Sequence, residues 1–168
     1  HDFIVVDCAG FSDLFFESEL FGYVRGSFAG AIHDKKGLLE LADGGTLFFD
    51  RVGTLKPALQ SKLARLLKDG TFYKIGGISQ IRVHVRFIAS TGVDLKTLVS
   101  KHKFREDLYY QLNVMRIIIP PLRERREDIL LLAEWFLSET AKKEGVERKE
   151  LTQEAKTILE SYAWPGNV

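Results

Sequence analysis

Three short apolar runs, each closed by a polar residue, constrain the fold more than any other feature of this sequence. They span residues 3–7, 46–50 and 83–90, and they end on Asp, Asp and Ser. Continuous apolar runs of this length are typical of strands buried inside α/β sheets. A helical pattern of leucines that begins near Pro57 lies between the second and third runs. Because open α/β sheets bind their ligands at the carboxyl ends of the strands, the polar ends predict a binding site there.

The sequence changes character after Pro120 and Pro121. It becomes helical and more charged, with two apolar stripes at helical spacing. We therefore expect an α/β core over residues 1–119, followed by the start of a small helical subdomain over residues 120–168. The chain begins directly on a strand and stops at a turn, so we interpret it as a piece of a longer protein.

Composition narrows the classes of function. The chain has 168 residues, 45% of them hydrophobic and 28% charged, which excludes a disordered tail and a collagen-like repeat. Its 24 basic and 23 acidic residues give a net charge of +1, so nucleic-acid binding through bulk electrostatics is not expected. A single cysteine, Cys8, excludes an internal disulfide and suits the reducing cytoplasm, where we expect the protein to act. No apolar run is long enough to cross a membrane, so no membrane partner is expected.

The second apolar run lies in the segment Gly-Gly-Thr-Leu-Phe-Phe-Asp, residues 44–50. A glycine turn, an apolar strand and a terminal carboxylate resemble a Walker B element, whose Asp holds the Mg²⁺ of a bound nucleotide, usually through water. Asp50 would then be the indirect magnesium ligand. The alternative is structural, because an Asp at a strand end often caps the following turn.

Two other segments contain residue types suited to chemistry. Residues 22–31 hold three glycines around Phe28, which predicts a flexible loop with an aromatic tip; the alternative is a glycine-rich turn with a buried Phe. Arg105 lies among acidic residues of a short predicted helix. It either forms an ion pair at the surface or reaches a phosphate in a neighbouring subunit. The histidines and Cys8 lack metal-ligand spacing, so no metal site built from side chains alone is expected.

These segments and several others together resemble a single family. The motifs occur in order at residues 17–22, 26–31, 44–50, 59–63, 104–110, 112–114, 120–125 and 164–168. The sequence thereby resembles the central AAA+ domain of bacterial sigma-54-dependent transcriptional activators. The resemblance implies a P-loop-type α/β fold, with a parallel sheet sandwiched by helices and followed by a helical lid. It also implies a ring-forming ATPase that remodels the sigma-54 RNA polymerase holoenzyme, using ATP or ADP with Mg²⁺ at a site between subunits.

The resemblance assigns roles to particular residues. Asp50 and Arg105 would be catalytic, and both would bind the nucleotide together with Thr91. The family's phosphate loop would precede residue 1. The loop that contacts the sigma factor would consist of Gly26, Ser27, Phe28, Ala29, Gly30 and Ala31.

Five positions depart from the family pattern. Arg51 stands where an acidic residue orients and activates the attacking water, and an Arg has no base function at neutral pH. Gly92 replaces an Asn that senses the terminal phosphate, and Gln111 replaces a second arginine finger. Ala29 lacks the hydroxyl with which family members engage sigma-54. Asp7 replaces an Asn that can hydrogen-bond the catalytic acid.

The changes at Asp7 and Arg51 are interpreted as a linked pair. A carboxylate and a guanidinium on adjacent strand ends can form a bidentate ion pair. Our hypothesis is that a hydrolytic switch has become a fixed structural bridge. Loss of the water-activating acid, one finger and the sensor Asn is expected nearly to abolish hydrolysis, since one arginine finger alone contributes about 10³–10⁵ in rate.

These departures favour a nucleotide-responsive, oligomerising transcriptional regulator that hydrolyses ATP poorly and works without sigma-54. The branch that includes the Vibrio biofilm polysaccharide-gene regulators, which respond to cyclic di-GMP, is the resemblance that fits them, so cyclic di-GMP is a second candidate ligand. Expected partners are RNA polymerase with its sigma factor, further copies of the chain, and DNA through a domain outside it. One alternative is a conventional sigma-54 activator ATPase with tolerated substitutions. The other is a structural interaction module that binds no nucleotide.

Overall fold

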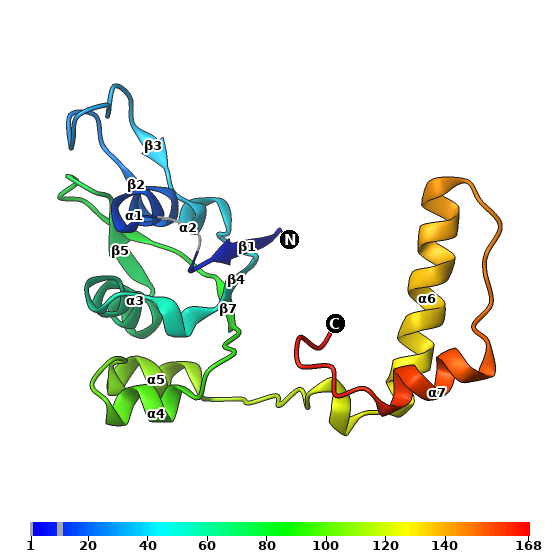
Figure 1. The fold of residues 1–168 in the computed structure, drawn as a ribbon. Coiled ribbons are helices and arrows are strands. Elements are labelled where there is room, and N and C mark those ends of the chain that lie inside the picture. Colours follow the sequence, from blue (N-terminus) through cyan, green and yellow to red (C-terminus); the bar gives the residue numbers. More distant parts are fainter. Residues whose placement is uncertain (1, 10–11) are drawn as a thin grey trace. The chain divides into compact units, whose positions relative to one another are not determined.

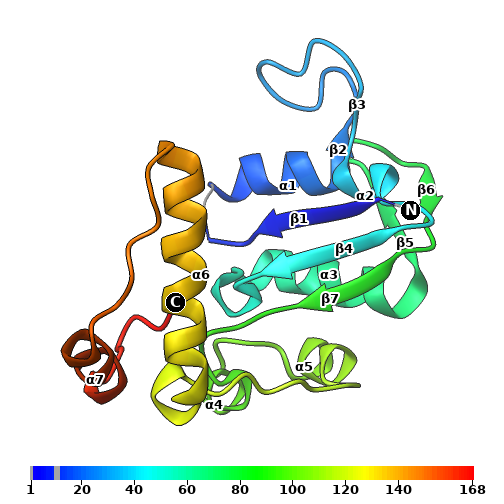
Figure 2. The same ribbon diagram turned by 90° about the vertical axis from the view of Figure 1, so that its right-hand side faces the viewer.

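A parallel sheet of three strands lies at the centre of the N-terminal part of the chain (Figures 1 and 2). Its order is β1 (Phe3–Asp7), β4 (Thr46–Asp50) and β7 (Arg86–Ala89), so β4 is the middle strand. The pairing of β1 with β4 places Asp7 beside Asp50. Because the strands run in the same direction, their polar ends meet at one edge of the sheet, as the sequence predicts.

The computed structural model describes residues 2–9 and 12–168. It divides into two compact units, residues 1–116 and 117–168, and the boundary lies in a segment without helix or strand. Among the described residues, no helix is long and apolar enough to cross a membrane.

The third strand is shorter than the apolar run that predicts it. The amide of Val83 donates to the carbonyl of Gly70 at 3.0 Å, and the amide of His84 donates to Oδ1 of Asp43 at 2.7 Å. Backbone groups that are paired with these segments cannot join the ladder with β4. The strand expected over residues 83–90 therefore begins only at the start of β7.

Described helices cover one face of the sheet. Phe49 points to that face and is fully buried with side chains from α1 (Asp13–Phe21) and α3 (Pro57–Asp69). On the opposite face, Phe3 and Val5 are 61% and 57% exposed. The first strand, predicted to be buried, is covered on only one face in the described chain, since successive side chains of β1 alternate between the core and an open face.

Short elements complete the N-terminal unit. The helix α3 carries Pro57 at its first position and ends at Gly70, whose φ of 65° is left-handed, as is common just after a helix. The strands β2 and β3 pair with each other, as do β5 and β6, and both pairs are antiparallel. The bounds of these remaining elements are β2 (Gly22–Tyr23), β3 (Lys35–Lys36), α2 (Leu38–Leu41), η1 (Val52–Thr54), β5 (Thr71–Tyr73), β6 (Gln80–Arg82), α4 (Leu95–Ser100) and α5 (Glu106–Leu112).

The C-terminal unit is helical, as expected for the segment that follows the two prolines. Its elements are η2 (Leu122–Glu124), α6 (Glu127–Glu144) and α7 (Gln153–Ser161). Thr152 caps α7, because its hydroxyl oxygen accepts a hydrogen bond from the amide of Ala155 at 3.2 Å. Oδ1 of Asn167 accepts from the amide of Leu122 at 2.9 Å and so ties the last residues to the beginning of the unit.

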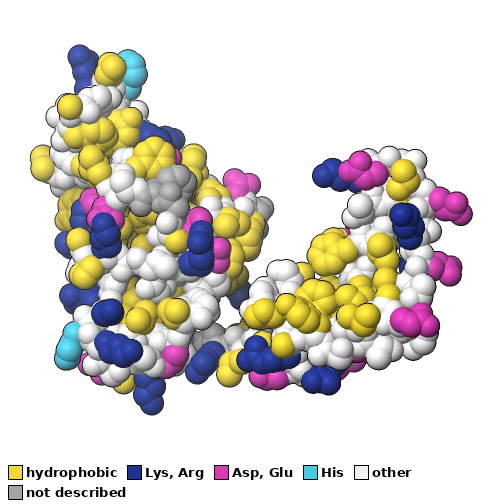
Figure 3. Space-filling model, viewed as in Figure 1, with side chains coloured by type: hydrophobic (Ala, Val, Ile, Leu, Met, Phe, Trp, Pro, Cys, Tyr) yellow, Lys and Arg dark blue, Asp and Glu magenta, His cyan; other side chains and the backbone are white. Residues whose placement is uncertain are grey.

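Large apolar side chains remain exposed on this helical unit (Figure 3). They include Leu131, Trp135 and Phe136 of α6, and the two aromatic rings contact each other edge to face. Exposed apolar surface of this kind is typical of faces that pack against another domain or partner.

Candidate functional site

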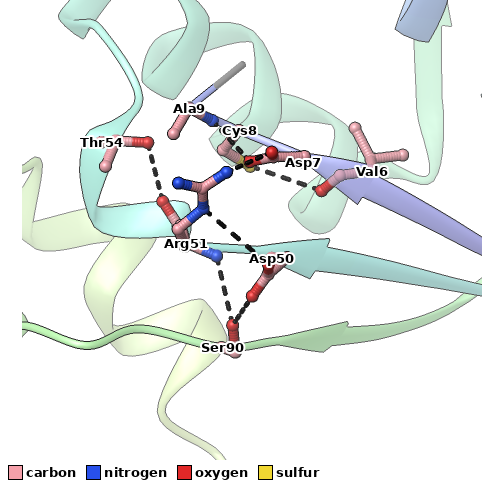
Figure 4. A network of polar contacts seen from close by, with 8 residues as sticks. All are labelled: Val6, Asp7, Cys8, Ala9, Asp50, Arg51, Thr54 and Ser90. Carbon is pink, nitrogen blue, oxygen red and sulfur yellow. Dashed lines mark hydrogen bonds and ion pairs between the residues drawn. The ribbon is translucent and has the colours of Figure 1, made fainter. Parts of the chain in front are cut away.

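A cluster of polar side chains lies where β1, β4 and β7 end (Figure 4). Ser90 directly follows β7, and its hydroxyl donates to Oδ1 of Asp50 at the end of β4. The same hydroxyl oxygen accepts from the backbone amide of Arg51 at 3.1 Å. One serine therefore fixes both the Asp50 carboxylate and the backbone of Arg51.

Arg51 has an unusual backbone conformation. Its φ of 57° lies in the left-handed region, which few residues other than glycine adopt. Its carbonyl accepts hydrogen bonds from both the hydroxyl and the amide of Thr54, at 2.8 and 3.0 Å. This tight turn at the start of η1 holds the backbone in a position from which the side chain reaches across to β1.

The Arg51 guanidinium lies between two carboxylates. Nη2 forms an ion pair with Oδ2 of Asp7, and Nε lies 3.9 Å from Oδ2 of Asp50. The predicted ion pair with Asp7 is present, but the prediction that it is bidentate is wrong. Only Oδ2 of Asp7 contacts the guanidinium, whereas Oδ1 accepts a hydrogen bond from the amide of Ala9 at 2.9 Å.

Local hydrogen bonds and burial shift the ionisation of two neighbouring groups in opposite directions. The amide of Ala9 lowers the pKa of Asp7 below its usual value, and the Arg51 side chain adds to this effect. Burial raises the pKa of the Cys8 thiol to about 12, and the negative charges of Asp7 and Asp50 contribute to the rise. The Asp7 carboxylate is therefore charged at neutral pH, and the Cys8 thiol is neutral.

We predict that Cys8 resists alkylation in the folded protein. A thiol pKa raised from 9.0 to about 12 lowers the thiolate fraction at pH 8 by about 10³-fold, and the thiolate is the reacting form. Mass spectrometry of the peptide that contains Cys8 after iodoacetamide treatment measures this rate, with the urea-unfolded protein as the control. Equal rates in the two samples would contradict the buried placement of the thiol.

Arg105 is held by side chains of its own neighbourhood. Its Nε and Nη2 donate to the two carboxylate oxygens of Asp107 at 3.0 and 2.8 Å, and Nη1 donates to the Ser61 hydroxyl at 3.2 Å. Asp107 raises the pKa of Arg105, and Arg105 lowers the pKa of Asp107. A cavity of about 540 Å³ adjoins Arg105, with His102 and Lys103 among its lining residues. The ion pair expected on structural grounds is present, and the cavity leaves space beside the arginine.

Gln60 supports Arg105 and was not identified from the sequence as a site residue. It is fully buried on α3, and its Oε1 accepts from the backbone amide of Arg105 at 2.8 Å. Its Nε2 donates to the carbonyls of Leu55 and Lys103 at 2.7 and 3.0 Å. Two sequence signals could have found it: its place in the motif at residues 59–63, and a glutamine among the leucines of α3.

Three further positions to which the resemblance gives a role toward the nucleotide, Thr91, Gly92 and Gln111, lie in different settings. Thr91 forms a local turn, in which its hydroxyl donates to the carbonyl of Val93 at 2.8 Å. A Cβ added to Gly92 would meet no atom within 4 Å, so the site of the missing Asn is open. Gln111 lies on α5, and its Oε1 is buried without a hydrogen-bond partner among the described residues. No contact found in the described ranges joins Arg105 or Gln111 to the strand-end cluster.

The expected sigma-contact loop, residues 26–31, connects β2 and β3. Gly26 and Gly30 have left-handed φ values of 82° and 101°, and the amide of Gly26 donates to the carbonyl of Ala31 at 2.8 Å. Phe28 is half-buried because its ring packs edge-on against Tyr23, with centroids 5.0 Å apart. It is therefore neither a free aromatic tip nor a fully buried core residue.

Comparisons with known proteins identify the family. Residues 1–118 match the sigma-54 interaction domain, and residues 123–168 match the AAA+ ATPase lid domain. The chain belongs to the sigma-54 interaction domain family. It is 49% identical over 166 residues to the Nif-specific regulatory protein of Azotobacter vinelandii and equally to the transcriptional regulator NtrC of Salmonella typhimurium. These matches cover 99% of this chain but 32% and 35% of the relatives, so the chain spans about a third of their length.

Solved structures agree with the family assignment. NtrX from Brucella abortus in complex with ADP has a TM-score of 0.89 and 34% identity, over 99% of this chain and 36% of that chain. The same protein in complex with ATP has a TM-score of 0.88 and 35% identity, over the same shares. Hsp104 is more distant, with a TM-score of 0.66 and 21% identity over 97% of this chain and 32% of that chain, and shows the fold alone. The predicted AAA+ fold with a helical lid is confirmed.

Magnesium does not fit the strand-end cluster as it stands. Oδ1 of Asp50 accepts the Ser90 hydroxyl, and Oδ2 faces the Arg51 guanidinium. Mg²⁺ prefers oxygen ligands and keeps several waters, and a positive charge within this distance disfavours a second cation. Among the described residues, no group of three or more His, Cys, Asp or Glu side chains could hold a metal ion.

Proposed function

We propose that this chain is the central regulatory domain of a bacterial transcriptional regulator that acts in the cytoplasm, binds ATP or ADP and assembles with copies of itself. It hydrolyses ATP slowly and does not depend on sigma-54. Membership of the sigma-54 interaction domain family supports the regulatory role, since the relatives include NtrC and the Nif-specific regulator. The NtrX complexes with ADP and ATP support the choice of nucleotide.

The position of Arg51 is the main observation that supports slow ATP hydrolysis. The residue after the Walker B Asp must orient and deprotonate the attacking water, and a guanidinium cannot accept that proton. Its ion pair with Asp7 holds the side chain across the strand ends rather than leaving it free to turn away. Gly92 lacks the side-chain amide of the Asn that the family uses toward the phosphate, and Gln111 lacks the guanidinium of the second arginine finger. Both departures support slow hydrolysis.

Ala29 supports independence from sigma-54. It is exposed in the loop between β2 and β3, and it offers a methyl group where the family presents a hydroxyl. We therefore propose that the protein contacts RNA polymerase with a different sigma factor, and that a domain outside this chain binds DNA. We also propose that the protein resembles the branch of the Vibrio biofilm polysaccharide-gene regulators. Cyclic di-GMP is then a second candidate ligand beside ATP and ADP.

A conventional sigma-54 activator ATPase is the alternative. Asp50, Arg105 and Phe28 retain the family residue types, and residues 1–118 match the whole interaction domain. This alternative requires sigma-54 for every promoter that the protein activates, whereas the proposed regulator does not require it.

Transcript profiling of two deletion strains separates these functions. One strain lacks this protein and the other lacks sigma-54, and we expect the transcripts controlled by this protein to be unchanged in the second strain. Loss of the same transcripts in both strains would favour the conventional activator. Calorimetric titration of the full-length protein with ATP, ADP and cyclic di-GMP then identifies the ligand. If none of the three binds, the protein is the structural interaction module that binds no nucleotide.

A further inference from the structure

The end of the sheet brings two carboxylates side by side. Asp7 and Asp50 are partners in the parallel pairing of β1 with β4, and both side chains extend from the same edge. Two neighbouring carboxylates would ordinarily favour a divalent cation, since carboxylate oxygens are the preferred ligands of Mg²⁺ and Mn²⁺. In this chain, however, a positive charge already lies between them.

Each oxygen of the two carboxylates already has one polar or charged neighbour. For Asp7, one oxygen accepts from the amide of Ala9 and the other contacts the Arg51 guanidinium. For Asp50, one oxygen accepts from Ser90 and the other faces the same guanidinium. A divalent cation would have to displace the guanidinium or share its space, and both cost electrostatic free energy.

The backbone of Arg51 makes this arrangement more than an adventitious surface ion pair. Exposed ion pairs are usually weak because both side chains must be ordered to form them. Here the amide of Arg51 is bonded to Ser90 and its carbonyl to Thr54, in a left-handed conformation. The turn therefore directs the guanidinium toward the two carboxylates before any ligand binds.

We infer that the Arg51 guanidinium is the resident cation of this strand-end cluster and that it replaces Mg²⁺, so that this chain binds its adenine nucleotide without a divalent metal. The inference rests on the proposed nucleotide binding. Removing the guanidinium would leave Asp7 and Asp50 as an unshielded carboxylate pair, so loss of Arg51 creates a metal requirement that the wild type lacks.

The test compares ATP affinity of the full-length protein in excess Mg²⁺ with that in EDTA, by calorimetric titration. We expect a ratio close to one for the wild type and at least about tenfold tighter binding with Mg²⁺ for Arg51→Ala. Arg51→Gln, which keeps most of the side-chain length, provides a second variant if the first does not fold. Arg65→Ala is the matched control, because Arg65 also lies 3.9 Å from a carboxylate, that of Asp69, but on α3.

A second readout follows the metal itself. The electron paramagnetic resonance signal of Mn²⁺ with ATP is expected to change on binding to Arg51→Ala and to stay that of free Mn²⁺–ATP with the wild type. Tenfold tighter binding of ATP to the wild type in Mg²⁺, or equal ratios in wild type and Arg51→Ala, would overturn the inference while leaving the proposed function intact. Absence of ATP binding to every variant, with and without Mg²⁺, would overturn both.

Discussion

Full-length protein that carries Asp7→Asn, Arg51→Glu, Gly92→Asn and Gln111→Arg is expected to hydrolyse ATP at least about 10³-fold faster than the wild type. The glutamate supplies a group that can orient and activate water, and the new arginine restores a charge that alone contributes about 10³–10⁵ in rate. Asp7→Asn is required because a glutamate at position 51 would otherwise face two carboxylates. A Cβ at position 92 would meet no atom within 4 Å, and no left-handed φ opposes the substitution of Gly92.

A matched variant separates chemistry from simple loss of charge. Replacing Arg51→Glu by Arg51→Gln in the same set keeps every other change but supplies no base. We expect this second protein to hydrolyse ATP at least about 10²-fold more slowly than the protein with Arg51→Glu, because it lacks the general base. If the Arg51→Glu and Arg51→Gln proteins both bind ATP and hydrolyse it at equal rates, the residue at position 51 does not limit hydrolysis.

Gln60→Leu is expected to lower the free energy of unfolding by about 3 kcal/mol or more. The substitution replaces the amide by an apolar side chain of similar size, and it leaves the carbonyls of Leu55 and Lys103 and the amide of Arg105 without their partner. Each buried polar group that loses its hydrogen bond costs about 1–3 kcal/mol. Urea unfolding followed by circular dichroism measures the change.

Lys68→Leu is the control for this prediction, because Lys68 lies on the same helix but is exposed. We expect its effect to stay within about 0.5 kcal/mol. If Gln60→Leu unfolds at the same urea concentration as Lys68→Leu, the three hydrogen bonds do not stabilise the fold as the geometry implies.

Local sequence pattern predicted the strands where neighbouring segments did not interfere. The runs that became β1 and β4 have the predicted bounds, since their backbones pair with each other. The third run lost its first residues to Gly70 and Asp43, which are distant in sequence and could not be read from the run itself. The exposure of one face of β1 was not predicted, because an apolar run does not reveal which face other elements cover.

The location of the polar cluster could be predicted from the sequence, because parallel strands bring their carboxyl ends together at one edge of the sheet. The pairing of Asp7 with Arg51 follows from two departures at adjacent strand ends, and it is present. The contact of Asp7 Oδ1 with the Ala9 amide and the role of Ser90 depend on local backbone geometry that the sequence does not reveal. Gln60 lies in the motif at residues 59–63, but its supporting role is recognised only from the three backbone groups that it bonds.

The most direct measurement is ATP binding and steady-state ATP hydrolysis by the wild-type full-length protein, side by side with NtrC of Salmonella typhimurium under the same conditions. Saturable binding of ATP with turnover at least about 10³-fold slower than that of NtrC is the predicted result, because Arg51 supplies no base. Hydrolysis at the rate of NtrC would contradict it, and the protein would then be a conventional sigma-54 activator in which Arg51 is tolerated.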